Sequence, residues 1–212
     1  VIRESCFNGS SEMVSQLAAA VTTFLFNRTM MNLLGEDGVA AITIIIYSQF
    51  LLNTLYIGCA IGIAPIIGFN YGNGNEVRQK QVFSISIRFI AAVSVLIFAA
   101  SRFGGSYIVR LFADDTSEVY RIAADGFAMF SYSFLFCGLN QFASAMFTAL
   151  SNGRVSAILS FLRTFGLLAG GIVLLPRVWG LAGVWLAAPV AEGVMFAVSV
   201  ACLAAYRSRD AY

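Results

Sequence analysis

The chain has 212 residues, of which 59% are hydrophobic and only 11% are charged, with a formal net charge of +2. Ordinary soluble domains are about 45–50% apolar and about 25% charged, so this composition excludes a soluble domain and predicts an integral membrane protein. The small charge and the scattered basic residues give no nucleic-acid-binding surface. Histidine is absent, and the four cysteines form no metal-binding pair.

Six stretches are long and apolar enough to cross a bilayer core of ~30 Å, which requires about 20 residues each. They are predicted at residues 10–34, 39–69, 82–101, 122–150, 155–175 and 181–206. Residues 102–121 are too short and too charged to span, and are predicted to lie at the membrane interface as a helical piece. Pro176 is expected to close the fifth span. The fold class is therefore an all-α membrane protein, a six-transmembrane-helix bundle over residues 1–212.

Lysine and arginine distribute unevenly between the two sides of these spans. Because cytoplasmic loops are enriched in these residues, the richer side is predicted to be cytoplasmic, with both termini there and the chain in the plasma (inner) membrane. That side carries Arg3, Arg78, Lys80, Arg154, Arg207 and Arg209.

Polar residues recur at helical spacing on three of the spans. Each could simply form hydrogen bonds from helix to helix, but three stripes on three helices favour a shared, wetted cavity for a substrate or ion. The candidates are Gln16, Thr23 and Asn27 on the first span, Gln49, Asn53 and Tyr56 on the second, and Ser133, Asn140, Gln141, Ser144 and Thr148 on the fourth.

Three charges fall well within the spans: Arg88, Arg163 and Glu192. Arg163 and Glu192 lie on consecutive antiparallel spans at similar depth, and a single charge there would be costly. We predict that they form a buried ion pair. The pair is either structural or a protonatable coupling site.

The end of the second span contains Gly62, Pro65 and Gly68, which are hinge candidates. Proline removes a backbone hydrogen bond and weakens the helix about four residues earlier. No catalytic constellation, nucleotide-binding loop or metal-ligand spacing is present in the sequence, so we expect no enzyme activity, cofactor or metal.

Several motifs resemble those of the multidrug and toxic compound extrusion (MATE) transporters. GIAPIIGFNYGNG at residues 62–74, followed by Arg78, resembles the exit of the eighth helix in that family. GEDGVAA at 35–41, LSNGR at 150–154 and GLAGVW at 180–185 agree in order, together with Arg163, Pro189 and Glu192.

The resemblance implies one lobe of a twelve-helix MATE-type antiporter, namely the second of its two six-helix lobes. It implies that the seventh, eighth and tenth helices line the cavity, and that the two lobes rock to export organic, often cationic, drugs by Na⁺ or H⁺ antiport. The partner would be the N-terminal lobe, which this chain lacks, or a second copy. In the sodium-coupled branch of the family, carboxylates occupy the positions that best match Ala19 and Gly138. This chain has no carboxylate at either position, so the resemblance does not identify the coupling ion.

Two alternatives remain. One is a flippase for lipid-linked precursors from the same superfamily, which would favour a more cationic cavity. The other is a stand-alone helical scaffold or channel that acts as a homodimer.

Overall fold

The computed structural model describes residues 2–209, and the side chains of residues 13 and 17–206 apart from residue 76. Within that part of the chain all regular structure is helical and no strand occurs, which confirms the predicted all-α class. The helices are α1 (Ile2–Gly72), α2 (Glu76–Arg110), α3 (Glu118–Phe130), α4 (Phe134–Ala149), α5 (Gly153–Phe161), α6 (Gly170–Trp179) and α7 (Leu181–Arg209), with a 3-10 turn η1 (Ser131–Ser133) and a π-helical segment η2 (Leu162–Ala169).

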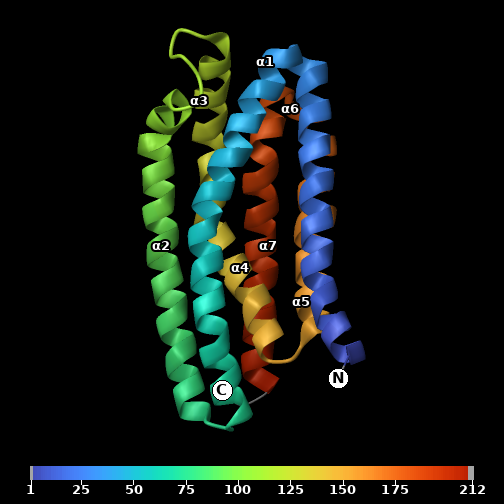
Figure 1. Cartoon of the computed structure of the whole chain (residues 1–212), viewed down its shortest axis with the longest axis vertical. Coiled ribbons are helices and arrows are strands. Elements are labelled where there is room, and N and C mark those ends of the chain that lie inside the picture. Colours follow the sequence, from blue (N-terminus) through green and yellow to red (C-terminus); the bar gives the residue numbers. More distant parts are fainter. Residues whose placement is uncertain (1, 210–212) are drawn as a thin grey trace.

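Five helical spans are long and apolar enough to cross a membrane, instead of the six separate helices predicted. The difference lies in the first, Leu17–Gly72, which has 56 residues. Drawn straight it would be about 84 Å long, far more than a bilayer core. The backbone instead turns at Gly35 (φ 66°, ψ −146°), and Figure 1 shows α1 folded there into two antiparallel arms. With its two arms counted separately, the described part of the chain has six helical segments of membrane-spanning length.

The turn at Gly35 depends on a backbone conformation that is open almost only to glycine. We expect Gly35→Ala to destabilise the protein by roughly 1–3 kcal/mol, although an added Cβ would meet nothing within 4 Å. Gly58→Ala is the matched control, because it also meets nothing but lies in ordinary helix. Thermal unfolding in detergent would measure both. Equal Tm values for the two variants would contradict the role of Gly35.

The predicted interfacial helix at residues 102–121 is wrong. Helix α2 continues to Arg110, and α3 already begins at Glu118, where the Ser117 hydroxyl accepts from the Tyr120 N–H at 3.1 Å. The intervening turn is fixed by Asp114, whose carboxylate accepts from the N–H and hydroxyl of Thr116. These hydrogen bonds hold the pKa of Asp114 below its usual value. Arg102 and Arg110 do not break α2, because both side chains are exposed near the end of the helix and can reach water.

The fifth crossing also differs from its prediction, since Pro176 does not close it. Helix α6 continues past Pro176 to Trp179. The next residue, Gly180, caps the helix with a φ of 55°, which favours glycine over other residues. A proline near the end of a helix removes only one ladder hydrogen bond, and neighbouring groups can compensate in a membrane helix.

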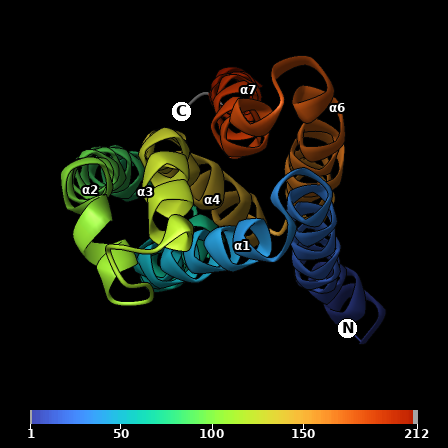
Figure 2. The same ribbon diagram turned by 90° about the horizontal axis from the view of Figure 1, so that it is seen from above.

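The two ends of the described chain lie at the same end of the bundle. Figure 1 shows the start of α1, the end of α7, the α1–α2 turn and the α4–α5 connection at the bottom, with the Gly35 bend and the α2–α3 loop at the top. From above, the first arm of α1 lies beside α6 on one side of the bundle, α2 and α3 lie on the other side, and α4 lies nearer the middle (Figure 2). One hydrophobic core cluster of the bundle is rich in aromatic residues, because Phe127, Phe130, Phe134 and Trp185 are almost fully buried in it. Many large apolar side chains remain exposed, as a lipid-facing surface requires.

Candidate functional site

Arg163 and Glu192, which were expected at similar depth on consecutive spans, form an ion pair. Arg163 lies in η2 and Glu192 in α7, and the Glu192 carboxylate atom Oε1 lies 2.7 Å from Arg163 Nη2 and 2.8 Å from Nε. The two side chains are only 20% and 9% exposed. Two charges withdrawn from water need further hydrogen bonds to offset the loss of hydration.

The second carboxylate oxygen of Glu192 meets α4. The Asn140 amide donates to Glu192 Oε2 at 2.7 Å and to the Glu192 main-chain carbonyl at 3.0 Å. The Ser199 hydroxyl, two turns further along α7, donates to Asn140 Oδ1 at 2.9 Å. Glu192 therefore has a partner on each carboxylate oxygen, and the amide that holds it is itself held in orientation.

The guanidinium of Arg163 extends the network towards α1. It donates to Gln141 Oε1 at 2.8 Å and to Cys137 Sγ at 3.1 Å, and the Cys137 thiol donates to Asn53 Oδ1 at 3.2 Å. A continuous chain of polar contacts thus joins the second arm of α1, α4, η2 and α7. We call it the buried network.

Sequence reasoning missed two members of the buried network. Neither Cys137 nor Ser199 is among the residues predicted for the cavity or the charge pair. A signal existed for both: Cys137 lies four residues before Gln141, and Ser199 seven residues after Glu192, so each shares a helix face with a predicted residue.

Arg163 lies in a stretch of π-helix, which no sequence pattern predicted. Its wider turns shift the register of the residues that follow, and such segments are rare and frequent at functional sites. Here the segment carries the only cationic side chain of the buried network.

Gly138 is one of the two residues that best match the carboxylate positions of the sodium-coupled branch. A Cβ added there would lie 2.5 Å from Ser94 Oγ and 2.7 Å from Tyr56 Cε1. Tyr56 is buried, and its hydroxyl donates to the Phe134 carbonyl at 2.8 Å. The space for a carboxylate is therefore filled by the tyrosine of the neighbouring helix.

The other predicted cavity residues are dispersed. Ser144 forms hydrogen bonds with Ser156 at 2.9 Å and Ser160 at 3.1 Å, and Thr148 with Ser156 at 2.8 Å, so these hydroxyls connect α4 to α5. The Thr23 hydroxyl donates to the Ala19 carbonyl in its own helix.

Two predicted residues have unsatisfied buried oxygens. Asn27 Oδ1 and Ser133 Oγ have no hydrogen-bond partner within the part of the chain that the structure describes. Gln49 is half-buried, and the Gln16 side chain lies outside the described residues. The structure thus joins Asn53, Asn140 and Gln141 in the buried network and leaves the others apart.

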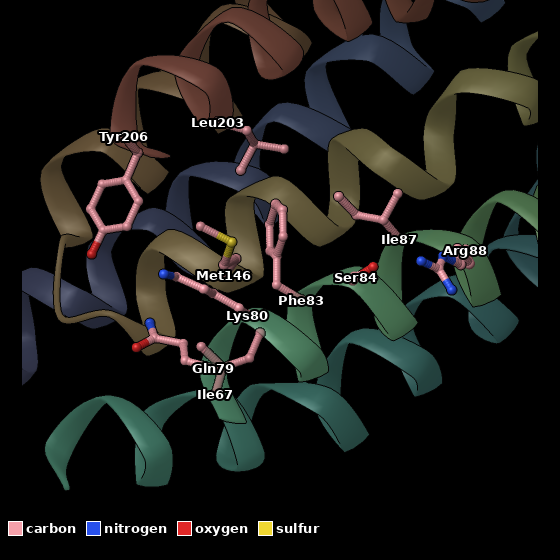
Figure 3. A pocket seen from close by; sticks show the side chains of 10 residues that line it. All are labelled: Ile67, Gln79, Lys80, Phe83, Ser84, Ile87, Arg88, Met146, Leu203 and Tyr206. Carbon is pink, nitrogen blue, oxygen red and sulfur yellow. The ribbon is translucent and has the colours of Figure 1, made fainter. Parts of the chain in front are cut away.

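A pocket of about 410 Å³ opens at the end of the bundle that holds the α1–α2 turn. Residues of α1, α2, α4 and α7 line it, among them Lys80, Arg88 and Tyr206 (Figure 3). None of the residues predicted for the cavity lines this pocket.

The chain is similar to known proteins in both sequence and fold. The model of the MatE family matches residues 13–170. The structure is similar to the MATE transporter VcmN of Vibrio cholerae (TM-score 0.86, 20% identity, covering 96% of this chain and 46% of that one). It is also similar to an outward-facing multidrug resistance MATE family transporter of the MOP superfamily (TM-score 0.82, 22% identity, 90% and 43%).

A third similar structure is a MOP superfamily transporter from Pyrococcus furiosus (TM-score 0.80, 20% identity, 93% and 45%), whose binding pocket is described as having reverse polarity. No curated protein sequence matches the chain. The chain spans less than half the length of each of these three structures.

An all-helical bundle with several long apolar helices defines a multi-pass integral membrane protein. The chain belongs to the MatE family, whose model covers most of its length.

Proposed function

We propose that the chain is the C-terminal lobe of an antiporter that exports organic, often cationic, drug-like compounds and is coupled to Na⁺ or H⁺. The observation that carries the proposal is the extent of the structural similarity. Nearly the whole chain superposes on MATE-type transporters, while occupying less than half of each. A lobe of this kind needs a partner, which is the N-terminal lobe of the same protein or a second copy.

Transport would proceed by rocking of the two lobes, so that the cavity between them opens alternately to each side. We place the end with the α1–α2 turn and the α4–α5 connection in the cytoplasm, at the plasma (inner) membrane. Arg78, Lys80 and Arg154 support this orientation, because they all lie towards that end of the bundle.

We infer that the buried network is where the lobe would sense the coupling ion. Glu192 is its only acid, held between a guanidinium and an amide. Proton or cation binding at Glu192 would weaken its pairing with Arg163 and change how η2 packs on α7. The chemistry allows either ion, since carboxylate, amide and hydroxyl oxygens can bind Na⁺ and a carboxylate can take a proton.

The proposal is tested by expressing the whole reading frame in bacterial cells that lack their own drug exporters. We expect these cells to accumulate less ethidium than cells without the protein. Collapse of the ion gradient should return ethidium accumulation to the level of cells without the protein. Unchanged ethidium together with rescue of a strain deficient in precursor flipping would identify the flippase instead. A reading frame that ends at this chain, with a homodimer in solution, would favour the scaffold or channel.

Pro65 offers a test of the hinge. Helix α1 keeps helical geometry through Pro65, but the Ile61 carbonyl lacks the N–H that another residue would supply. We expect Pro65→Ala to change the maximal export rate several-fold while the concentration for half-maximal export stays within about two-fold. Ile61→Leu is the control, because the Ile61 side chain is exposed in the same arm of α1 and its substitution should leave both quantities unchanged. A changed affinity with an unaltered rate would count against a mechanical role.

A further inference from the structure

The pocket at the α1–α2 end of the bundle is separate from the buried network and has a different chemistry. Its walls come mainly from apolar side chains such as Ile67, Phe83 and Leu203. Two cations, Lys80 and Arg88, also line it, and none of its ten lining residues is acidic. Figure 3 shows these two side chains towards opposite ends of the pocket, with Phe83, Ser84 and Ile87 between them.

Lys80, Ser84 and Arg88 follow one another at intervals of four residues, so they lie on one face of α2. Helix α2 has 35 residues and is about 52 Å long, which leaves roughly 11 Å outside a ~30 Å core at each end. A centred α2 would place Ser84 near the boundary of the hydrocarbon, Lys80 in the headgroup layer, and Arg88 about 6 Å deeper than Ser84.

The two cations have no counter-charge among the side chains that the structure describes. Neither Lys80 nor Arg88 forms an ion pair with any residue whose side chain the structure describes, and both are exposed. An arginine at hydrocarbon depth is costly unless it meets an anion or extends towards the headgroups. An organic cation would be repelled here, so the pocket is not suited to the proposed substrate.

We propose that this pocket binds an anionic phospholipid of the surrounding bilayer. The phosphate lies beside Ser84, between the Lys80 and Arg88 side chains, and an acyl chain lies along Phe83 and Leu203. Basic pockets between membrane helices are suited to such headgroups. Helix α2 also presents apolar side chains to the lipid phase, because its Val77, Ile85 and Phe89 are exposed. The bound lipid would tie α2 to α7.

The test uses the protein expressed from its whole reading frame and purified in mild detergent. Phosphatidylglycerol or phosphatidylcholine is titrated in, and native mass spectrometry counts the bound lipids. We expect phosphatidylglycerol to bind more tightly. Lys80→Gln and Arg88→Gln should each weaken it about five-fold, and the double variant about 25-fold. Arg102→Gln is the control, because Arg102 is exposed on the same helix far from the pocket.

Ser84→Trp provides a second variant that keeps both charges but fills the space between them, and it should lose phosphatidylglycerol binding as well. Equal binding of the two lipids, an equal loss in Arg102→Gln, or retained binding in Ser84→Trp would overturn the proposal. Displacement of the lipid by ethidium would also overturn it, since the pocket would then belong to the drug pathway. Lipid binding is measured without transport, so a failure of the proposed function would not affect the result.

Discussion

Replacing Arg163 with leucine is expected to lower Tm by roughly 6–20 °C. The substitution leaves the Glu192 carboxylate buried beside Asn140 without its counter-charge. Breaking a buried pair by removing one partner costs about 3–5 kcal/mol, and each kcal/mol lowers Tm by about 2–4 °C in a chain of this size. Thermal unfolding of the purified protein, followed by tryptophan fluorescence or by loss of the monodisperse peak, would measure the effect.

The double variant Arg163→Leu with Glu192→Leu is the control for this prediction. Replacing a buried pair by apolar residues is often neutral or stabilising, so we expect the double variant to recover much of the Tm lost by Arg163→Leu. If Arg163→Leu, Glu192→Leu and the double variant all unfolded at the wild-type temperature, the ion pair would contribute nothing to the stability of the fold.

The same pair separates a structural role from a coupling role. Glu192→Gln keeps an oxygen for Arg163 but removes the negative charge of the carboxylate. A coupling site predicts a folded protein whose ethidium export no longer responds to the ion gradient, whereas a structural pair predicts a lower Tm with gradient-driven export preserved in the molecules that fold. Unchanged folding and unchanged transport would rule out the coupling role.

Gly183→Ala is expected to lower stability by about 3 kcal/mol, or roughly 6–12 °C in Tm. An added Cβ would overlap the Leu175 carbonyl group and lie 2.7 Å from the Pro176 nitrogen. These are backbone atoms of α6 that cannot rotate away as a side chain can. The start of α7 would have to move from α6, and the contacts of Trp185 with the core would move with it.

Gly104→Ala is the matched control for Gly183. Gly104 also lies in a helix, but a Cβ there meets nothing within 4 Å, so the substitution should be neutral or stabilise by up to about 1 kcal/mol. A loss of Tm in Gly104→Ala as large as that in Gly183→Ala would show that helix flexibility, and not the close approach of α6 and α7, explains the result.

The class of protein could be predicted from the sequence, because continuous apolar stretches of about 20 residues have the length of membrane-spanning helices. It also indicated the breaks at Gly35 and at Gly72–Gly74, since glycine occupies backbone conformations that other residues avoid. The Arg163–Glu192 pair was predictable for a similar reason: an unpaired charge at that depth is too costly.

The contacts among the polar residues could not be predicted from the sequence, because they depend on how the helices pack. Helical spacing gives the face of one helix on which a residue lies, but it does not say which helix covers that face or at what height. Thus Asn53, Asn140 and Gln141 are joined through Cys137 and Arg163, while Ser144 and Thr148 of the same predicted stripe pack against α5. The extent of α2 past residue 101 and the π-helical register at Arg163 likewise depend on packing against neighbouring helices, which no local pattern contains.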